Sequence, residues 1–351
     1  MLTIDSTVQY YLEKNLQAAI EEYDVQNGAF GMIMDVNTGE VLAMATLGGY
    51  DPNNYLEIYD QELDAELESL YQQAIANPKD SEAYTTGIDA YNAAMAAARL
   101  SQWRNRCVSD GYEPGSTFKI ITLASALEEN AVSLNDTFYC GGKTHIKGRV
   151  SELNCWQARG HGTQTTAQAL QNSCNVAFAN IGIALGGETF YDYIEAFGLL
   201  QPTGIDLPGE SKGLFFSEGV LADPNSYASL TSVAFGQTFK VTPIQLVRAI
   251  SAVVNGGYLL EPYIVSEIQD ANGSTVEKNE RTVIRQVISE QTSETMCSLI
   301  EQVVTVGTGK NAKVAGYRIG GKTGTSERSI STTRTASWWT TKSSPLSALR
   351  R

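Results

Sequence analysis

The chain of 351 residues is short of several features, and each shortage excludes a class of protein. No run of apolar residues is long enough to cross a bilayer, and residues 1–5 do not form a signal peptide. Lysine and arginine together number 25, against 39 aspartates and glutamates, which gives a net charge of −14. This acidic balance argues against nucleic acid or an anionic membrane surface as a partner.

Cysteine is also too rare to build a disulfide-rich scaffold, since the whole chain contains 5. Cys140 and Cys155 flank a loop that contains glycine and lysine, and they could pair in an oxidising compartment. Five free thiols are the alternative, and the sequence alone leaves both possibilities open. What remains is an ordinary globular composition, with 42% hydrophobic and 18% charged residues, which allows a sizeable core.

A serine and a lysine three positions apart are the most informative feature that is present. Pro114 and Gly115 interrupt the chain as a loop, and an apolar, helix-forming run from Ile120 to Leu127 follows. On a helix, Ser116 and Lys119 share one face, so their side chains can meet. A serine hydroxyl needs a base to become a nucleophile, and burial near a helix N-terminus can lower the pKa of a lysine enough to provide one. By itself the pair is weak, because a helix cap followed by a surface lysine has the same spacing.

Two further motifs give the pair its significance. Ser173-Cys174-Asn175 and Lys322-Thr323-Gly324-Thr325 follow it along the chain. Serine β-lactamases and penicillin-binding proteins carry S-x-x-K, S-D-N and K-T-G together. All three motifs occur here in that order, with Cys174 in the place of the aspartate. From about Leu2 to Glu327, the chain resembles the transpeptidase domain of class B, monofunctional penicillin-binding proteins of the division or sporulation type.

The resemblance implies catalytic roles for four residues. Ser116 would be the nucleophile and Lys119 its base. Ser173 would lie against the amines of Lys119 and Lys322 and relay a proton to the leaving group. Asn175 would hydrogen-bond the peptide backbone of the substrate.

The resemblance also implies a substrate-binding strand, formed by residues 314–321 and the K-T-G motif. Lys322 and Thr323 would hold the carboxylate of the substrate, and the strand that continues into Gly324 would pair with the substrate peptide. The backbone N–H groups of Ser116 and Thr325 would form the oxyanion hole. No metal and no cofactor is expected. His161 is one of only 2 histidines, but a serine–lysine pair needs no histidine, so a structural role is favoured for it.

The implied fold is the α/β (α+β) penicillin-binding and serine β-lactamase-like fold, an antiparallel sheet flanked by helices plus an all-helical subdomain. The sequence patterns agree with it. Helices are expected over 6–22, 165–185 (interrupted at Ser173 and Asn175), 243–254 and 284–305, and strands over 29–35 and 40–45 around a turn at 37–39. Residues 51–105 predict an acidic amphipathic helix followed by an alanine-rich one. The charges of the acidic helix favour a face exposed to solvent over a surface that docks a partner.

The implied function is peptidoglycan D,D-transpeptidation, in which an acyl-serine cross-links D-Ala-D-Ala stem peptides and penicillins bind covalently. A β-lactamase, a D,D-carboxypeptidase and an inactive truncated fragment are the alternatives. Class A β-lactamases need an activating glutamate after the second motif, and Glu152, the nearest candidate, precedes Ser173. Expected partners are stem peptides, β-lactams and a membrane glycosyltransferase of the parent protein. The parent is expected at the extracytoplasmic face of the bacterial cell membrane, although this chain carries neither anchor nor signal.

The last residues of the chain differ in character from the rest. Residues 328–351 contain no glycine, aspartate or glutamate, whereas the rest is strongly acidic. We therefore expect a transpeptidase domain over residues 1–327, truncated before its last strands, and an atypical tail over 328–351, frameshifted or non-native. On this interpretation the strand of Lys322 lacks its neighbour, unless the β-prone residues 331–342 replace it, and the chain is poorly stable.

Overall fold

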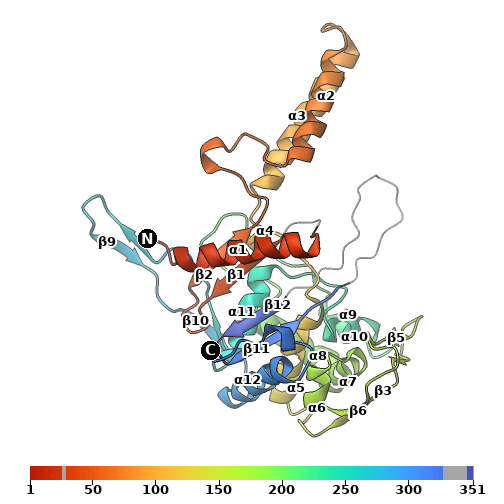
Figure 1. Ribbon diagram of the computed structural model, residues 1–351. Helices are drawn as coiled ribbons and strands as arrows, with labels where there is room; N and C mark the ends of the chain where they lie inside the picture. The colour runs from red at the N-terminus through yellow and green to blue at the C-terminus, as the bar shows by residue number, and fades with distance from the viewer. Residues whose placement is uncertain (26–28, 327–345, 351) are drawn as a thin grey trace.

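A computed structural model describes residues 1–25, 29–326 and 346–350. Helices surround and cover several short antiparallel strand pairs, as expected for the implied α/β fold (Figure 1). The main core lies among the helices that follow residue 115, where Phe118, Phe178 and Phe239 are among the largest fully buried side chains. Within the described residues, none of the helices combines the length and the apolar character needed to cross a membrane.

The N-terminal segment forms the predicted helix and hairpin. Helix α1 (Ser6–Tyr23) begins at Asp5, whose carboxylate accepts hydrogen bonds from the backbone N–H groups of Thr7 and Val8. Strands β1 (Phe30–Met34) and β2 (Val41–Thr46) pair antiparallel. The turn between them places Gly39 at a φ of 88°, which a side chain would disfavour. Alternate residues of β2 are buried, so this strand attaches the hairpin to the body.

Four helices build the body that carries the site. They are α5 (Lys119–Glu128), α7 (Asn175–Leu185), α11 (Pro243–Val254) and α12 (Glu290–Thr305). Helix α5 contacts each of the other three, so it lies at the centre of the layer. Helix α11 has the predicted start, because Thr242 and Gln245 form a reciprocal capping box and Pro243 occupies the first turn.

Shorter elements connect these helices. The helices among them are η1 (Pro52–Asn54), α4 (Arg106–Ser109), η2 (Gly115–Phe118), α6 (Thr166–Gln171), α8 (Gly187–Ala196), α9 (Glu218–Leu221), α10 (Ala228–Ala234) and η3 (Lys310–Ala312). The strands are β3 (Thr137–Cys140), β4 (Lys143–Thr144), β5 (Leu153–Asn154), β6 (Gly162–Thr165), β7 (Tyr258–Leu260), β8 (Glu267–Gln269), β9 (Thr275–Lys278) and β10 (Val283–Gln286). Strand β3 pairs with β6, and β4 pairs with β5.

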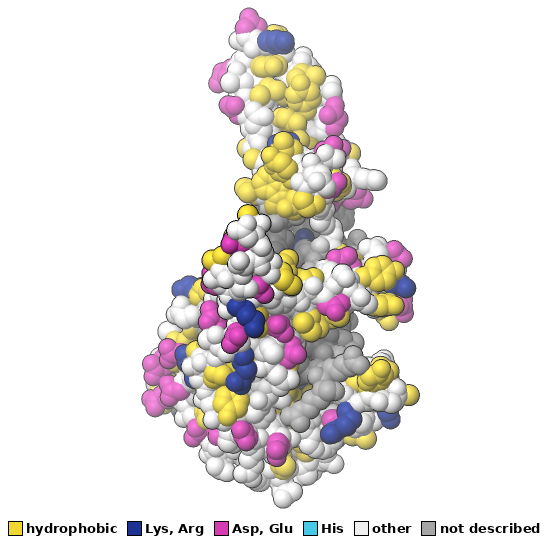
Figure 2. Space-filling model, turned by 90° about the vertical axis from the view of Figure 1, so that its left-hand side faces the viewer, with side chains coloured by type: hydrophobic (Ala, Val, Ile, Leu, Met, Phe, Trp, Pro, Cys, Tyr) yellow, Lys and Arg dark blue, Asp and Glu magenta, His cyan; other side chains and the backbone are white. Residues whose placement is uncertain are grey.

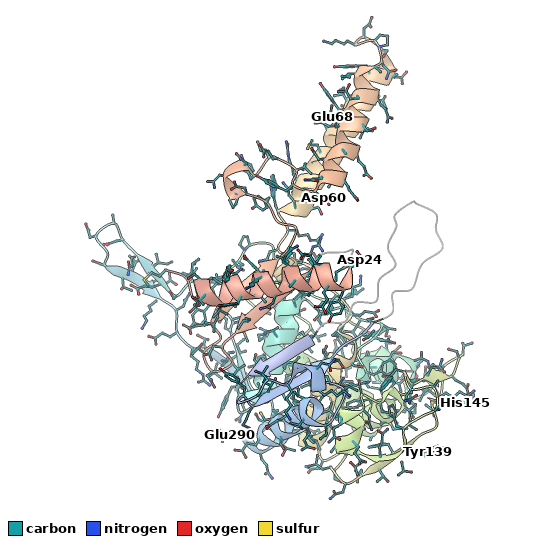
Figure 3. All side chains as sticks on the ribbon, viewed as in Figure 1. Asp24, Asp60, Glu68, Tyr139, His145 and Glu290 are labelled. Atoms are coloured by element: carbon teal, nitrogen blue, oxygen red, sulfur yellow. The ribbon has the colours of Figure 1, made fainter. Side chains whose placement is uncertain are left out.

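A helical hairpin projects from the body. Helices α2 (Gln61–Ile75) and α3 (Glu82–Gln102) pack along each other and extend away from the other elements (Figure 1). Figure 3 shows Asp60 at its base and Glu68 farther out along it. In Figure 2 acidic and hydrophobic side chains are interspersed on its surface, and Tyr59 and Leu100 are exposed. Residues 51–105 therefore form the two predicted helices.

Three sequence predictions need correction. The strand expected over 314–321 begins only at Ile319. The helix expected over 284–305 begins only at Glu290, because Ser289 caps it and Val283–Gln286 is strand β10, paired with β7. The strand that carries Lys322, β11 (Ile319–Thr323), does not lack a neighbour, since β12 (Leu346–Arg350) pairs with it antiparallel along its length. The alternative neighbour, residues 331–342, lies outside the described residues.

Candidate active site

Ser116 lies in the single turn η2 that leads into helix α5. Gly115 precedes it with a φ of 56°, and a Cβ atom there would lie 2.5 Å from the carbonyl oxygen of Thr325. The N–H group of Gly115 also donates to the carbonyl oxygen of Gly236 at 2.8 Å. A glycine is therefore required where the serine turn meets the end of β11. These contacts hold the half-buried Ser116 against the strand that carries the third motif.

Lys119 begins α5, one turn after Ser116, and its amine meets both of the first two motifs. The Nζ atom lies 3.0 Å from Ser116 Oγ, as the spacing predicted. It also donates to Ser173 O at 2.7 Å and to Asn175 Oδ1 at 2.8 Å, and lies 3.3 Å from Ser173 Oγ. The side chain is 0% exposed, so the amine is removed from water.

The second motif forms a tight turn between two helices. Asn172 ends α6, and Cys174 caps the N-terminus of α7 by accepting a hydrogen bond from the N–H group of Ala177. Ser173 lies between them with a φ of 52°, an uncommon conformation for a residue with a side chain. The turn directs the carbonyl and the hydroxyl of Ser173 toward the amine of Lys119. The interruption that the sequence predicted within residues 165–185 is this turn.

Strand β11 brings a second lysine to the same serine. Lys322 Nζ lies 2.8 Å from Ser173 Oγ and 2.9 Å from Thr323 O, and its side chain is 2% exposed. The hydroxyl of Ser173 therefore lies between two buried amines. The amine of Lys322 is directed at Ser173, while Thr323 and Thr325 line the open cleft. Gly324 is buried between these two threonines.

Burial controls the charge of both amines. It lowers the pKa of Lys119 to about 7. Burial, together with the nearby charge of Lys119, lowers the pKa of Lys322 well below its ordinary value. Near neutral pH an appreciable fraction of Lys119 is uncharged, with a lone pair that can accept the proton of Ser116. A serine and a neutral amine in this arrangement can carry out acyl transfer.

The cleft in front of Ser116 has a volume of about 600 Å³. Besides the motif residues, its walls include Arg149, Trp156, Phe235 and Gln237, which the sequence did not single out as site residues. Trp156 is fixed by a hydrogen bond from its ring nitrogen to the carbonyl oxygen of Asn172. The spacing of these four wall residues in the sequence does not indicate a site. They come from loops and from the end of a helix, and the positions of those segments depend on the tertiary fold.

Glu152 also lines the cleft, but its carboxylate is paired with other side chains. It pairs with Lys143 at 2.6 Å and with His145 at 3.1 Å. The hydrogen bond from Lys143 lowers the pKa of Glu152. Figure 3 shows His145 at the outer edge of the molecule, so these bonds orient the carboxylate toward the rim. Glu152 is poorly placed to activate a water molecule at Ser116.

Comparisons with known proteins identify the family of the chain. The sequence model of the penicillin binding protein transpeptidase domain matches residues 29–344. Stage V sporulation protein D of Bacillus subtilis (strain 168) is 40% identical over 329 residues, which cover 93% of this chain and 44% of the relative. Peptidoglycan D,D-transpeptidase FtsI of Escherichia coli (strain K12) is 26% identical over 328 residues, which cover 93% of this chain and 45% of the relative. The chain spans less than half the length of these relatives.

Solved structures share the fold. The D,D-transpeptidase domain of a peptidoglycan glycosyltransferase from Eggerthella lenta gives a TM-score of 0.71 at 27% identity, covering 93% of this chain and 71% of that chain. Penicillin binding protein 3 from Mycobacterium tuberculosis, solved in complex with aztreonam, gives a TM-score of 0.73 at 27% identity. The match covers 93% of this chain and 64% of that chain. Since the sequence match extends over most of the chain and the three motifs meet at one cleft, this chain belongs to the family of penicillin-binding protein transpeptidase domains, on its class B branch.

Proposed function

We propose that this chain is the catalytic domain of a peptidoglycan D,D-transpeptidase. The observation that carries the proposal is the contact of 3.0 Å between Ser116 Oγ and the fully buried amine of Lys119. Burial lowers the pKa of that amine to about 7, which suits a general base near neutral pH. Two relatives are named peptidoglycan D,D-transpeptidases with more than four-fifths of this chain matched, which favours the same reaction here.

In the first step, the Oγ atom of Ser116 attacks the carbonyl carbon of the D-Ala-D-Ala bond while Lys119 accepts the hydroxyl proton. The C–N bond breaks, and the departing D-Ala amine takes a proton through the hydroxyl of Ser173, which lies between Lys119 and Lys322. Backbone N–H groups of Ser116 and Thr325 hold the developing oxyanion. The product is an acyl ester on Ser116.

In the second step, the amine of another stem peptide attacks this ester. The new amide bond forms, the bond to Ser116 Oγ breaks, and the proton lost by the attacking amine returns to Ser116 through the same lysine. Asn175 and Thr323 both line the cleft and are suited to bind the peptide backbone and the carboxylate of the substrate. Lys322 acts on Ser173 through its buried amine.

The test of the nucleophile uses a fluorescent penicillin, because a β-lactam ring is opened by the same attack. We expect a covalent adduct on Ser116 that hydrolyses slowly, and no adduct on Ser116→Ala. Ser101→Ala, on the exposed end of α3, is the matched control and should label like the unmodified chain. Labelling that persists in Ser116→Ala would overturn the assignment.

The lifetime of the adduct separates this function from that of a β-lactamase. Rapid release requires a base that activates water, and the carboxylate of Glu152 is paired with Lys143 and His145. We therefore expect an intact-mass spectrum in which the penicillin adduct persists after excess drug is removed. Release within seconds, with accumulation of hydrolysed penicillin, would favour the hydrolase instead.

We further infer that the parent protein acts at the extracytoplasmic face of the bacterial membrane, with a glycosyltransferase as partner. The support is the substrate class, since cross-links form between stem peptides outside the cytoplasm, and the greater length of the relatives. A penicillin probe that cannot cross membranes should label the parent in intact cells. Labelling only after lysis would contradict this location.

A further inference from the structure

Three cysteines and a histidine converge beside the second motif. Cys140, Cys155 and Cys174 are buried, His161 is half-buried, and one ligand atom from each lies within 4.8 Å of all the others. Three of these residues are not part of the proposed acyl transfer. The fourth, Cys174, is the middle residue of the second motif, between Ser173 and Asn175.

Two of the distances within this cluster match those of a tetrahedral zinc site. A zinc ion with Zn–S bonds of about 2.3 Å and Zn–N bonds of about 2.0–2.1 Å holds two sulfurs about 3.8 Å apart, and a sulfur and a nitrogen about 3.6 Å apart. Here Cys155 Sγ lies 3.9 Å from Cys174 Sγ and 3.6 Å from His161 Nδ1. Three thiols and one imidazole are also a complete ligand set for structural zinc.

We propose that Cys140, Cys155, His161 and Cys174 bind one divalent cation of the zinc class as a closed structural site. The sequence predicted no metal, because the cysteines belong to separate segments and His161 has no motif of its own. On binding, the three thiols release their protons to solvent, and the neutral imidazole coordinates through Nδ1.

The backbone around the cluster is already held in place. Cys140 is the last residue of β3 and pairs with Gly162 of β6, which fixes its position relative to His161. The N–H group of Cys155 donates to the carbonyl oxygen of Gly142 at 2.8 Å, and Cys174 caps α7. The cation would therefore join β3, the loop before β6 and the start of α7.

Hydrogen bonding alone does not account for the position of the histidine. Its Nδ1 atom faces the thiol of Cys155, and its Nε2 atom is buried with no hydrogen-bond partner among the described residues. The ring also packs against Trp156, with their centroids 5.4 Å apart. A metal bond at Nδ1 supplies the strong interaction that this buried ring otherwise lacks.

The consequence for the active site is positional. Cys174 is bonded to Ser173 on one side and to Asn175 on the other, and both neighbours contact the amine of Lys119. A cation on Cys174 would fix this turn, in which Ser173 keeps its uncommon backbone conformation. The four ligands are positioning residues in this sense, since none of them is required to touch the substrate.

Metal content is the direct test. The chain, purified under reducing conditions without chelator and gel-filtered, is expected to contain one equivalent of zinc by elemental analysis. Replacement of the zinc by Co2+ should produce the thiolate-to-cobalt charge-transfer absorption of a tetrahedral site. Cys155→Ser and His161→Ala should each lose the bound equivalent. Cys297→Ser, a cysteine outside the cluster, is the control and should retain it.

A second measurement covers variants that fold poorly. Chelation of the unmodified chain should lower its melting temperature and slow penicillin acylation several-fold, and zinc ions added afterwards should restore both. Three outcomes would overturn the proposal: no stoichiometric metal in the folded chain, equal metal in Cys155→Ser and the unmodified chain, or a cysteine pair already oxidised to a disulfide in the purified protein. The metal count does not depend on acyl transfer, so it distinguishes failure of this site from failure of the proposed function.

Discussion

At the scale of single residues, the site depends on the removal of one amine, that of Lys119, from water. Among the described residues, the amine of Lys119 makes four contacts with oxygen atoms, and it lies 5.3 Å from the centroid of the Phe178 ring. Removal from water lowers the pKa of this lysine to about 7, whereas its few polar neighbours keep the amine oriented. The basicity of the site is therefore a result of packing around α5.

Lys119→Arg should abolish most of the reactivity of Ser116. A guanidinium remains protonated at any pH at which the chain is folded, so it retains the charge but cannot accept the serine proton. We expect the rate of acylation by fluorescent penicillin to fall at least about 100-fold, the usual contribution of a general base. Lys79→Arg, an exposed lysine between α2 and α3, is the matched control. If Lys119→Arg retains a rate within tenfold of the unmodified chain, another group is the base.

The rate of acylation should also depend on pH in a defined direction. The neutral form of Lys119 predominates above its pKa of about 7, so the rate should rise through neutrality and level off at higher pH. Below that pKa it should fall about tenfold per pH unit. Burial also lowers the pKa of the neighbouring amine of Lys322 well below its ordinary value. Stopped-flow acylation between pH 5.5 and 9 measures this profile, and a flat profile would rule out a titrating base.

At the scale of elements, local signals in the sequence predicted more than distant ones. The meeting of Ser116 with Lys119 follows from helical spacing alone, and Thr242 with Pro243 correctly located the start of α11. The false start of α12 was avoidable, because Ser289 is a strong helix cap and the residues before it are β-prone. By contrast, the approach of Cys140 to Cys174 requires the packing of β3 against α7, which no local pattern encodes.

The hairpin of α2 and α3 should be dispensable for chemistry. Its helices pack chiefly on each other, and its base is closed by short contacts, including a hydrogen bond of 2.8 Å from the ring nitrogen of Trp103 to Tyr55 O. Replacing residues 61–100 with a short glycine–serine linker should leave acylation within about twofold and the melting transition of the body unchanged, because the buried core is retained.

The control for this excision is a hairpin with the same helices and altered charge. Glu62→Lys and Glu66→Lys, four residues apart on α2, together reverse the sign of one exposed face of the hairpin. Both variants are expected to acylate normally. A large loss of acylation after excision, with the charge variant unaffected, would show that the hairpin supports the fold of the body.

At the scale of the whole molecule, the cleft depends on a strand pair formed by the end of the chain. Strand β12 pairs with β11 from Ile319 to Thr323, so it supports the strand that carries Lys322. The boundary proposed at residue 327 remains a prediction, as does the low stability expected for the chain. The prediction that β11 has no neighbour was wrong, because a segment of a few residues suffices to form a second strand.

Deleting residues 346–351 should weaken the whole site. The backbone hydrogen bonds between β11 and β12 would be lost, and at about 1 kcal/mol each their removal should lower the melting temperature by roughly 5 °C. Acylation should slow at the same time, because Lys322 lies on the strand left without support. Deleting Arg351 alone, beyond the paired residues, is the control. Equal melting temperatures for the two deletions would show that β12 contributes nothing to stability.

The contact between Ser173 and Lys322 joins residues that are 149 positions apart. A chain still being synthesised cannot form this contact until Lys322 has left the ribosome. The nucleophile and its base, by contrast, are three residues apart and emerge together. Reactivity toward penicillin should therefore appear only after residue 322 has emerged. Covalent labelling of Ser116 would then report the arrival of the strand of Lys322 during translation, and shorter chains would be protected from the drug.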